Sequence, residues 1–331
     1  MKRRTFIAGL GSAAAWPVMS RAQQPTMPVV AFIGPLSAEA SVRYLGAFHA
    51  GLGELGYVEG RNVVISYHWL NGNYDRIPSI MADLVRRRVA VIASPGGGSQ
   101  IARAAKAATV TIPTIFGVGE NPVSAGLVAS LARPGGNATG MNFFMTEAVP
   151  KRLGLLREIT PEANHLAVLT DPLVEQSQRE IRAVQDAARD SGVPISIFHA
   201  NSSREIEEAF AMMNSQGTEA LLILGNSYFG SRRVQLATLA MKYRIASSYP
   251  TREFVEVGGL MSYGPDLADT YRQGGVYAGR MLRGDKPDDL PVVQSTKFTL
   301  AINLKTAKAL GLHCRPAGGG THSGPATHYW V

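Results

Sequence analysis

The chain has 331 residues, of which 45% are hydrophobic and 18% charged, so it is long and apolar enough for two domains with a core each. The formal net charge is +8, but four basic residues lie within the first 21; without them the charge is about +4 and scattered, which excludes a nucleic-acid-binding surface. Cys314 is the only cysteine, which excludes an intrachain disulfide.

Residues 1–22 have the three-part pattern of an export signal. A basic head (residues 2–4) precedes an apolar and small-residue run (residues 6–18), and Ser20-Arg21-Ala22 offers small residues for cleavage near Ala22. The run is too short to span a bilayer as a permanent helix. The pair Arg3-Arg4 favours a twin-arginine signal over an ordinary one, and no cysteine for a lipid anchor follows. We therefore expect the mature protein in the periplasm.

After the signal, short β-rich apolar runs alternate with stretches of helical spacing. Gly56 follows the first of these stretches at the position that a helix C-cap favours. The expected strands of this first block are residues 28–34, 63–67, 89–93 and 113–118, and the expected helices are residues 41–55, 76–85 and 99–108.

A second block repeats the alternation. Its expected strands are residues 165–170, 195–198, 219–224 and 245–249, and its expected helices are residues 176–190, 206–213 and 232–243. Continuous apolar strands that alternate with helices indicate parallel sheets covered on both faces, so we predict an α/β fold with two Rossmann-like lobes. Ligands bind beyond the carboxyl ends of such strands, and these ends would face each other across a cleft.

Two glycine-containing loops follow strands, but neither completes a catalytic or nucleotide-binding motif. The loop from Gly96 has Ile101 where a dinucleotide-binding loop needs its third glycine. The loop from Gly225 to Gly230 is one residue too long for the Gly-x-Ser-x-Gly elbow of a serine hydrolase. The histidines are scattered over different elements and are not spaced as metal ligands. We therefore expect no catalytic centre, cofactor or metal.

Several longer segments carry a more specific signal when they are taken together. They are Gly51-Leu52-Gly53-Glu54-Leu55-Gly56-Tyr57-Val58-Glu59-Gly60-Arg61-Asn62-Val63, Gly126-Leu127-Val128-Ala129-Ser130-Leu131-Ala132-Arg133-Pro134-Gly135-Gly136-Asn137-Ala138-Thr139-Gly140, and residues 252–255, 258–264, 296–298 and 302–307. With these segments the chain resembles the ABC-transporter substrate-binding proteins related to tryptophan and tyrosine importers. The resemblance extends over residues 28–312.

This resemblance implies a type I periplasmic binding protein, whose two lobes are joined by a hinge of three strands. The expected passages between the lobes lie near residues 139–145, 249–262 and 290–298. Lobe one would hold residues 28–143, 250–262 and 298–312, and lobe two would hold residues 144–249 and 263–297.

Two segments depart from the family pattern. The family commonly has Asp-Pro after the fourth strand, where this chain has Glu120-Asn121-Pro122. The tail, residues 313–331, lacks the usual apolar and acidic helix, and its glycine-rich composition predicts disorder.

The loops after the strands supply the candidate ligand-binding residues in lobe one. We expect Ser37, Ser94, Pro95 and Gly96 to lie at an acidic group of the ligand, because helix N-termini with free N–H groups follow these loops. Glu120 and Asn121, together with Asp171 of lobe two, could take an ammonium or hydroxyl group. Each of these residues could equally have only a capping or loop role.

Lobe two adds polar and aromatic candidates. Asn226 and Tyr228 follow a predicted buried strand, and Tyr228, Phe229 and Tyr263 could stack on an apolar or aromatic part of the ligand. A loop or core role is the alternative for these residues as well.

We therefore expect a monomeric solute-binding protein of an ABC importer that is not an enzyme. It would close on a small-molecule ligand (an amino acid, an aromatic compound or a small carboxylate) and deliver it to a membrane permease with its ATPase. A sensory binding protein that presents the same cleft to a signalling receptor is one alternative, and an exported α/β enzyme is another.

Overall fold

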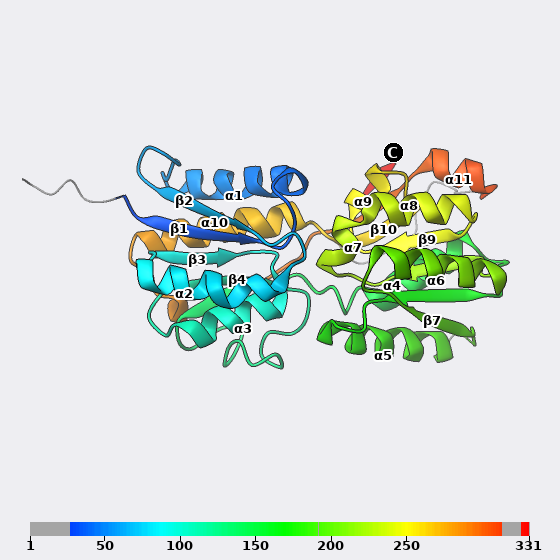
Figure 1. The fold of residues 1–331 in the computed structure, drawn as a ribbon, viewed down its shortest axis with the longest axis horizontal. Coiled ribbons are helices and arrows are strands. Elements are labelled where there is room, and N and C mark those ends of the chain that lie inside the picture. Colours follow the sequence, from blue (N-terminus) through cyan, green and yellow to red (C-terminus); the bar gives the residue numbers. More distant parts are fainter. Residues whose placement is uncertain (1–26, 191, 313–325, 331) are drawn as a thin grey trace, which may run out of the picture.

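The computed structural model describes residues 27–190, 192–312 and 326–330, which form two lobes side by side (Figure 1). Each lobe is a sheet with helices on both faces, so the predicted α/β class with two Rossmann-like lobes is confirmed. The predicted export signal, residues 1–22, lies outside the described residues. Within the described part of the chain, no helix is long and apolar enough to cross a membrane.

Lobe one is built on a six-stranded parallel sheet with the strand order β11-β5-β4-β3-β1-β2. Its strands are β1 (Val29–Gly34), β2 (Val64–Trp69), β3 (Val91–Ser94), β4 (Thr114–Val118), β5 (Ala138–Asn142) and β11 (Val293–Gln294). Its helices are α1 (Val42–Glu54), α2 (Ile77–Arg87), α3 (Gly98–Ala108) and α10 (Leu267–Leu282), with the short 3-10 helices η1 (Glu39–Ser41), η2 (Tyr74–Arg76) and η3 (Pro287–Asp289).

Alternate residues of β1 face the two helical layers of this lobe. Val30 and Phe32 are buried in the cluster formed with α1 and α10, whereas Ala31 and Ile33 are buried in the cluster formed with α2 and α3. Because helices cover both faces of the sheet, the strand is apolar without interruption. This coverage is the physical cause of the continuous apolar runs in the sequence.

Lobe two is built on a seven-stranded sheet with the order β13-β12-β10-β9-β8-β6-β7. All pairs are parallel except β10 and β12, which run antiparallel. The strands are β6 (Leu166–Thr170), β7 (Ile195–His199), β8 (Ala220–Ile223), β9 (Ala246–Tyr249), β10 (Met261–Pro265), β12 (Phe298–Ile302) and β13 (Ala326–Trp330). The helices are α4 (Val149–Ile159), α5 (Glu175–Asp190), α6 (Ser203–Ser215), α7 (Ser227–Ser231), α8 (Arg233–Lys242), α9 (Arg252–Glu256) and α11 (Leu304–Leu310).

The chain passes between the lobes three times, and the middle passage differs from the prediction. β10 pairs with β9 in the lobe-two sheet, with Met261 opposite Ser248, and α10 then returns to lobe one and packs along α1 (Figure 1). The passage therefore lies between β10 and α10, and not near residues 249–262. The other two passages follow β5 and separate β11 from β12.

The predicted lobe assignment of the C-terminal segments is therefore wrong. Residues 250–262 and 298–312 belong to lobe two, because β10 and β12 pair with each other and extend its sheet. Most of residues 263–297 belong to lobe one, because α10 covers one face of that sheet and β11 pairs with β5 at its edge. The lobe to which each segment belongs is decided by strand pairing between distant segments, and no local sequence pattern indicates that pairing.

The contact between α1 and α10 depends on glycine in both helices. A Cβ atom at Gly51 would overlap the backbone carbonyl of Arg272, and one at Gly275 would overlap the backbone carbonyl of Phe48. The two helix backbones therefore approach more closely than any side chain allows. Gly53 on the same helix α1 has open space around its Cβ position, so not every glycine of α1 serves this contact.

The C-terminal tail contains one described strand. β13 (Ala326–Trp330) pairs in parallel with β12, with Ala326 opposite Phe298. The prediction of disorder is therefore wrong for residues 326–330, because β12 offers an edge that accepts another strand. Residues 313–325 and 331 lie outside the described residues.

Candidate functional site

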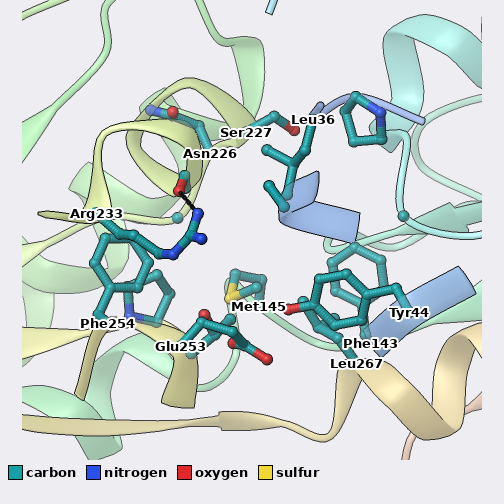
Figure 2. Close-up of a pocket in the computed structure, with 18 of the residues that line it drawn as sticks. Leu36, Tyr44, Phe143, Met145, Asn226, Ser227, Arg233, Glu253, Phe254 and Leu267 are labelled. Atoms are coloured by element: carbon teal, nitrogen blue, oxygen red, sulfur yellow. Dashed lines mark hydrogen bonds between the residues drawn. The ribbon is translucent and has the colours of Figure 1, made fainter. Parts of the chain in front are cut away.

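A cavity of about 140 Å³ lies in the cleft where the strand ends of the two lobes face each other. Residues from both lobes line it, and Figure 2 shows their side chains converging on it. Lobe one contributes Leu36, Tyr44, Gly96, Phe143, Leu267 and Tyr271, and lobe two contributes Gln176, Asn226, Ser227, Arg233, Glu253 and Phe254, with Met145 at the passage between the lobes.

Aromatic and aliphatic side chains make up most of the cavity wall. The rings of Tyr44 and Tyr271 are stacked, with centroids 4.8 Å apart and planes at 16°. Both rings are buried, and burial raises the pKa of each phenol above its usual range. Phe143 and Phe254 are buried at the same cavity. Such a wall suits a flat apolar group, which can stack on the tyrosine faces.

Arg233, the first residue of α8, brings a positive charge into this apolar cavity (Figure 2). Its Nη1 donates a hydrogen bond to the carbonyl oxygen of Gly230 at 3.1 Å, which holds the side chain in place. No carboxylate of the described residues lies within ion-pair distance of its guanidinium. The remaining N–H groups are therefore available for an anionic group.

Asn226 adds a second hydrogen-bond donor. It is the N-cap of α7, and its Oδ1 accepts a hydrogen bond from the Phe229 N–H at 2.7 Å. Because Oδ1 must face that N–H group, the orientation of the amide is fixed and Nδ2 points the other way. Nδ2 is buried and has no partner among the described residues. A buried donor without a partner costs free energy that a ligand acceptor would recover.

Glu253 supplies the negative charge of the cavity and connects the two lobes. It lies on α9 of lobe two, and its Oε1 is 3.4 Å from Nη1 of Arg43 on α1 of lobe one. The Tyr44 hydroxyl also interacts with this carboxylate: burial raises the pKa of Tyr44 most, and the charge of Glu253 raises it further. The carboxylate therefore already has a cation and a hydroxyl as partners.

A larger and more polar cavity of about 640 Å³ lies next to the first one. The two cavities share Gly98, Gln176, Gly225, Asn226 and Ser227 in their walls. The second cavity is also lined by Asp171, whose pKa is raised by burial despite the hydrogen bond from the Leu173 N–H. The cleft thus has an apolar end and a polar end.

Four of the residues predicted from the sequence line these cavities. Gly96 lines the first cavity, where a Cβ atom would overlap the Tyr271 hydroxyl. Asn226 lines both cavities, and Asp171 and Tyr228 line the second. The loops after the strands of both lobes therefore do reach the cleft.

The other predicted lobe-one residues line neither cavity, because local hydrogen bonds or packing occupy them. The Oγ of Ser37 accepts from the Ala40 N–H at 3.2 Å, and the buried Ser94 hydroxyl donates to the Ile33 carbonyl at 2.9 Å. Asn121 caps its own turn by accepting from the Val123 N–H. For Ser37 and Asn121 these are the capping roles that remained open as alternatives, whereas Ser94 links β3 to the neighbouring strand β1.

Pro95 and Tyr263 are likewise placed elsewhere. Pro95 packs against Gly117 and Gly274 inside lobe one. Tyr263 lies on β10 and stacks on Phe298 of β12, with ring centroids 5.7 Å apart. Tyr263 therefore lines neither cavity, and its role in stacking on a ligand stays a prediction.

Glu120 joins the lobes beside the cleft and lines neither cavity. Its side chain is 2% exposed, and its Oε2 is 2.7 Å from Nη1 of Arg179 on α5. Glu120 belongs to lobe one and Arg179 to lobe two, so this ion pair connects the two lobes. The carboxylate that departs from the family pattern is thus used between the lobes.

Glu180 lies behind the cavity wall and is fully buried. It accepts hydrogen bonds from Gln176 at 2.5 Å and from the Gly225 N–H at 3.3 Å, and both of these residues line the two cavities. Burial raises the pKa of Glu180 to about 7, although these hydrogen bonds and the charge of Arg152 lower it. A change in its protonation state therefore acts on two hydrogen bonds to residues of the cavity wall.

We expect the protein to lose stability as the pH rises through the range in which Glu180 ionises. In the unfolded chain the carboxyl group of Glu180 has its ordinary pKa of 4.5, whereas in the folded protein it keeps its proton until the pH approaches a pKa of about 7. Folded protein therefore binds more protons between pH 5 and 7, and the unfolding free energy falls by about 2 kcal/mol over that range. Urea unfolding at pH 5, 6 and 7 measures this.

Glu180→Gln removes the titrating group and should flatten the pH dependence. The exposed Glu158→Gln is the matched control and should leave the slope unchanged. An unchanged slope in Glu180→Gln would show that another group causes the dependence.

The sequence did not point to Arg233, Glu253, Tyr44 or Tyr271, which dominate the first cavity. All four lie on helices and not in the loops after strands. One signal was present: Glu253 lies in the first turn of α9, which is separated from the end of β9 by only two residues.

Comparisons with known proteins agree with this architecture. The family model "ABC transporter substrate binding protein" matches residues 28–316. The tyrosine-binding protein of Clostridioides difficile (strain R20291) is 26% identical over 265 residues, which are 80% of this chain and 75% of that protein.

Two solved structures share the fold. A conserved domain protein from Vibrio cholerae superposes with a TM-score of 0.80 at 24% identity, over 88% of this chain and 97% of that one. The ABC domain from Streptococcus pneumoniae in complex with L-Trp superposes with a TM-score of 0.77 at 23% identity, over 86% of this chain and 95% of that one.

The family match covers nearly all of the described chain, and the fold and the interlobe cavity are those that a closing binding protein requires. This protein therefore belongs to the ABC transporter substrate-binding proteins, a family of solute-binding proteins and not of enzymes, and it has the type I periplasmic binding protein fold.

Proposed function

We propose that this protein captures a small carboxylate with an aromatic or similarly apolar body between its lobes and delivers it to the permease and ATPase of an ABC importer. One observation carries the choice of ligand: Arg233 is directed into a cavity whose other walls are mostly apolar and aromatic. A guanidinium in such surroundings binds a carboxylate strongly, because little water competes with the pairing.

The aromatic body is supported by the stacked pair Tyr44 and Tyr271 and by the names of the relatives. One relative is called a tyrosine-binding protein, and one structural neighbour holds L-Trp. Aromatic amino acids and aromatic acids without an amino group therefore both belong in the ligand search.

Binding would be coupled to closure of the lobes. Two ion pairs, Glu253 with Arg43 and Glu120 with Arg179, connect the lobes. A ligand held by Arg233 of lobe two and stacked on Tyr44 of lobe one adds a further link, and so favours the closed arrangement. The permease would then recognise the closed form.

The proposal includes export. Residues 1–22, with the twin-arginine pattern Arg3-Arg4, would direct the folded monomer to the periplasm and be cleaved near Ala22. Amino-terminal sequencing of the secreted protein tests this part independently of ligand binding.

The test of ligand binding is thermal unfolding against a panel of aromatic amino acids, aryl carboxylates and small aliphatic carboxylates. A ligand present at 100 times its Kd should stabilise the folded protein by about 2.7 kcal/mol and raise the Tm by roughly 5 °C. Recovery of the ligand unchanged would fit a binding protein. No shift with any aromatic carboxylate, in a protein that melts cooperatively, would refute the proposed ligand class.

A further inference from the structure

We infer that the apolar cavity selects aryl carboxylates that lack an α-ammonium group over the corresponding aromatic amino acids. This inference rests on the proposed function and narrows the ligand class of the same site. It depends on which charges of the cavity already have partners inside the protein.

The groups that remain available in the cavity are hydrogen-bond donors. Arg233 is engaged by one backbone carbonyl, that of Gly230, and its other N–H groups have no acid partner among the described residues. Asn226 Nδ2 is buried without a partner in the same part of the chain. Both residues belong to lobe two and line the first cavity. A carboxylate has the acceptor oxygens to satisfy both donors.

The one carboxylate of the cavity is already engaged. Glu253 has Arg43 at 3.4 Å and interacts with the hydroxyl of Tyr44, and Arg43 lies also 3.7 Å from Glu256. The side chain of Glu253 is 22% exposed, whereas that of Arg43 is 48% exposed, so the carboxylate is the shielded partner and the guanidinium reaches it from the solvent side. An incoming ammonium group would have to share Glu253 with a guanidinium that is already present.

The other carboxylates near the cleft do not replace it. Glu120 pairs with Arg179 through Oε2, and although its buried Oε1 has no partner among the described residues, this side chain lines neither cavity; Asp171 lines only the second, polar cavity. Glu180 is fully buried behind the wall, in contact with Gln176. An α-ammonium group beside the ligand carboxylate would therefore lose its water without gaining a partner of its own.

With Glu253 and Arg43 neutralising each other, the cavity retains the charge of Arg233 alone. A ligand with one negative charge and no positive charge balances it. An amino acid brings an additional cation into an apolar cavity whose one carboxylate among the described residues, Glu253, already pairs with Arg43, and this difference is the basis of selection.

The experiment compares ligand pairs that differ only in the amino group, by isothermal titration of the purified protein. The pairs are L-tyrosine with 3-(4-hydroxyphenyl)propionate, L-tryptophan with indole-3-propionate, and L-phenylalanine with 3-phenylpropionate. We expect the acid without the amino group to bind at least tenfold more tightly in the pair that fits best. Equal or tighter binding of the amino acid would overturn the inference and leave the proposed function intact, whereas absence of binding by all six would refute the proposed function itself.

Arg43→Met tests the cause of the selectivity. Removing Arg43 frees Glu253 for a ligand ammonium, so the ratio of the two affinities should move at least tenfold toward the amino acid. Because both ligands are measured on the same variant, any loss of stability or of closure cancels in the ratio. Arg86→Met, on an exposed surface of α2, is the matched control and should keep the original ratio. An unchanged ratio in Arg43→Met would contradict the inference that pairing with Arg43 keeps Glu253 from binding a ligand ammonium group.

Discussion

Replacing Arg233 by methionine is expected to lower the affinity for an aryl carboxylate at least 100-fold, while the unfolding free energy stays nearly unchanged. Methionine keeps much of the apolar stem but removes the charge that pairs with the carboxylate. Loss of one partner of a shielded, hydrogen-bonded charge pair typically costs about 2–5 kcal/mol of binding free energy. Arg233 makes only one backbone hydrogen bond in the free protein, so folding depends little on it. Isothermal titration and urea unfolding measure the two quantities.

Two further variants make this result specific. Arg233→Lys keeps the charge but loses the planar fork of donors, so we expect an intermediate loss of roughly tenfold. Arg232→Met removes the neighbouring charge, which lies 5.5 Å from the centre of the Tyr228 ring and outside the first cavity, and affinity should change less than twofold. Equal losses in Arg232→Met and Arg233→Met would mean that the local charge and not this side chain matters.

Gly275→Ala is expected to destabilise the protein by roughly 3 kcal/mol, the upper part of the range for an added methyl group in a tightly packed core. The new Cβ would overlap the carbonyl oxygen of Phe48 and approach the Leu52 nitrogen. Because the obstacle is backbone, no side-chain rotation relieves it, and α1 and α10 must move apart. Urea unfolding followed by circular dichroism measures the loss.

Gly53→Ala is the matched control, because its Cβ would point into open space on α1. There alanine should be neutral or stabilise the helix by about 0.5–1 kcal/mol. The contact also matters for binding, since α1 carries Tyr44 and α10 carries Tyr271, whose rings stack in the cavity wall. If Gly275→Ala were as stable as Gly53→Ala, the inference that the backbones of α1 and α10 are in close contact at Gly275 would be wrong.

Much of the fold could be predicted because the apolar pattern is local. Strands such as β1 and β3 are buried on both faces, so nearly all of their four to six residues are apolar, and the sequence displays this directly. The helices α1 and α2 have one apolar face each, which gives the periodicity that identified them. The two-lobed α/β class follows from the repetition of this pattern.

The site was harder to predict because its main groups come from different elements. Arg43 and Glu253 are 210 residues apart in the chain and meet only because α1 and α9 face each other across the cleft. Ser37, Ser94 and Asn121 have the right residue types in the right loops, yet each forms a hydrogen bond to nearby backbone. Whether a polar side chain caps its own loop or faces a ligand depends on the neighbours that folding brings.

The sequence by itself thus determined the alternation of strands and helices, the doubled α/β class and the resemblance to a transport binding protein, because burial on each element leaves a local pattern. Only the tertiary structure decided that β10 and β12 belong to lobe two and α10 to lobe one, because pairing and packing between distant segments leave no such pattern. It also decided that Arg233 keeps its charge free while Glu253 does not, because that difference depends on which partners lie within a few ångströms after folding.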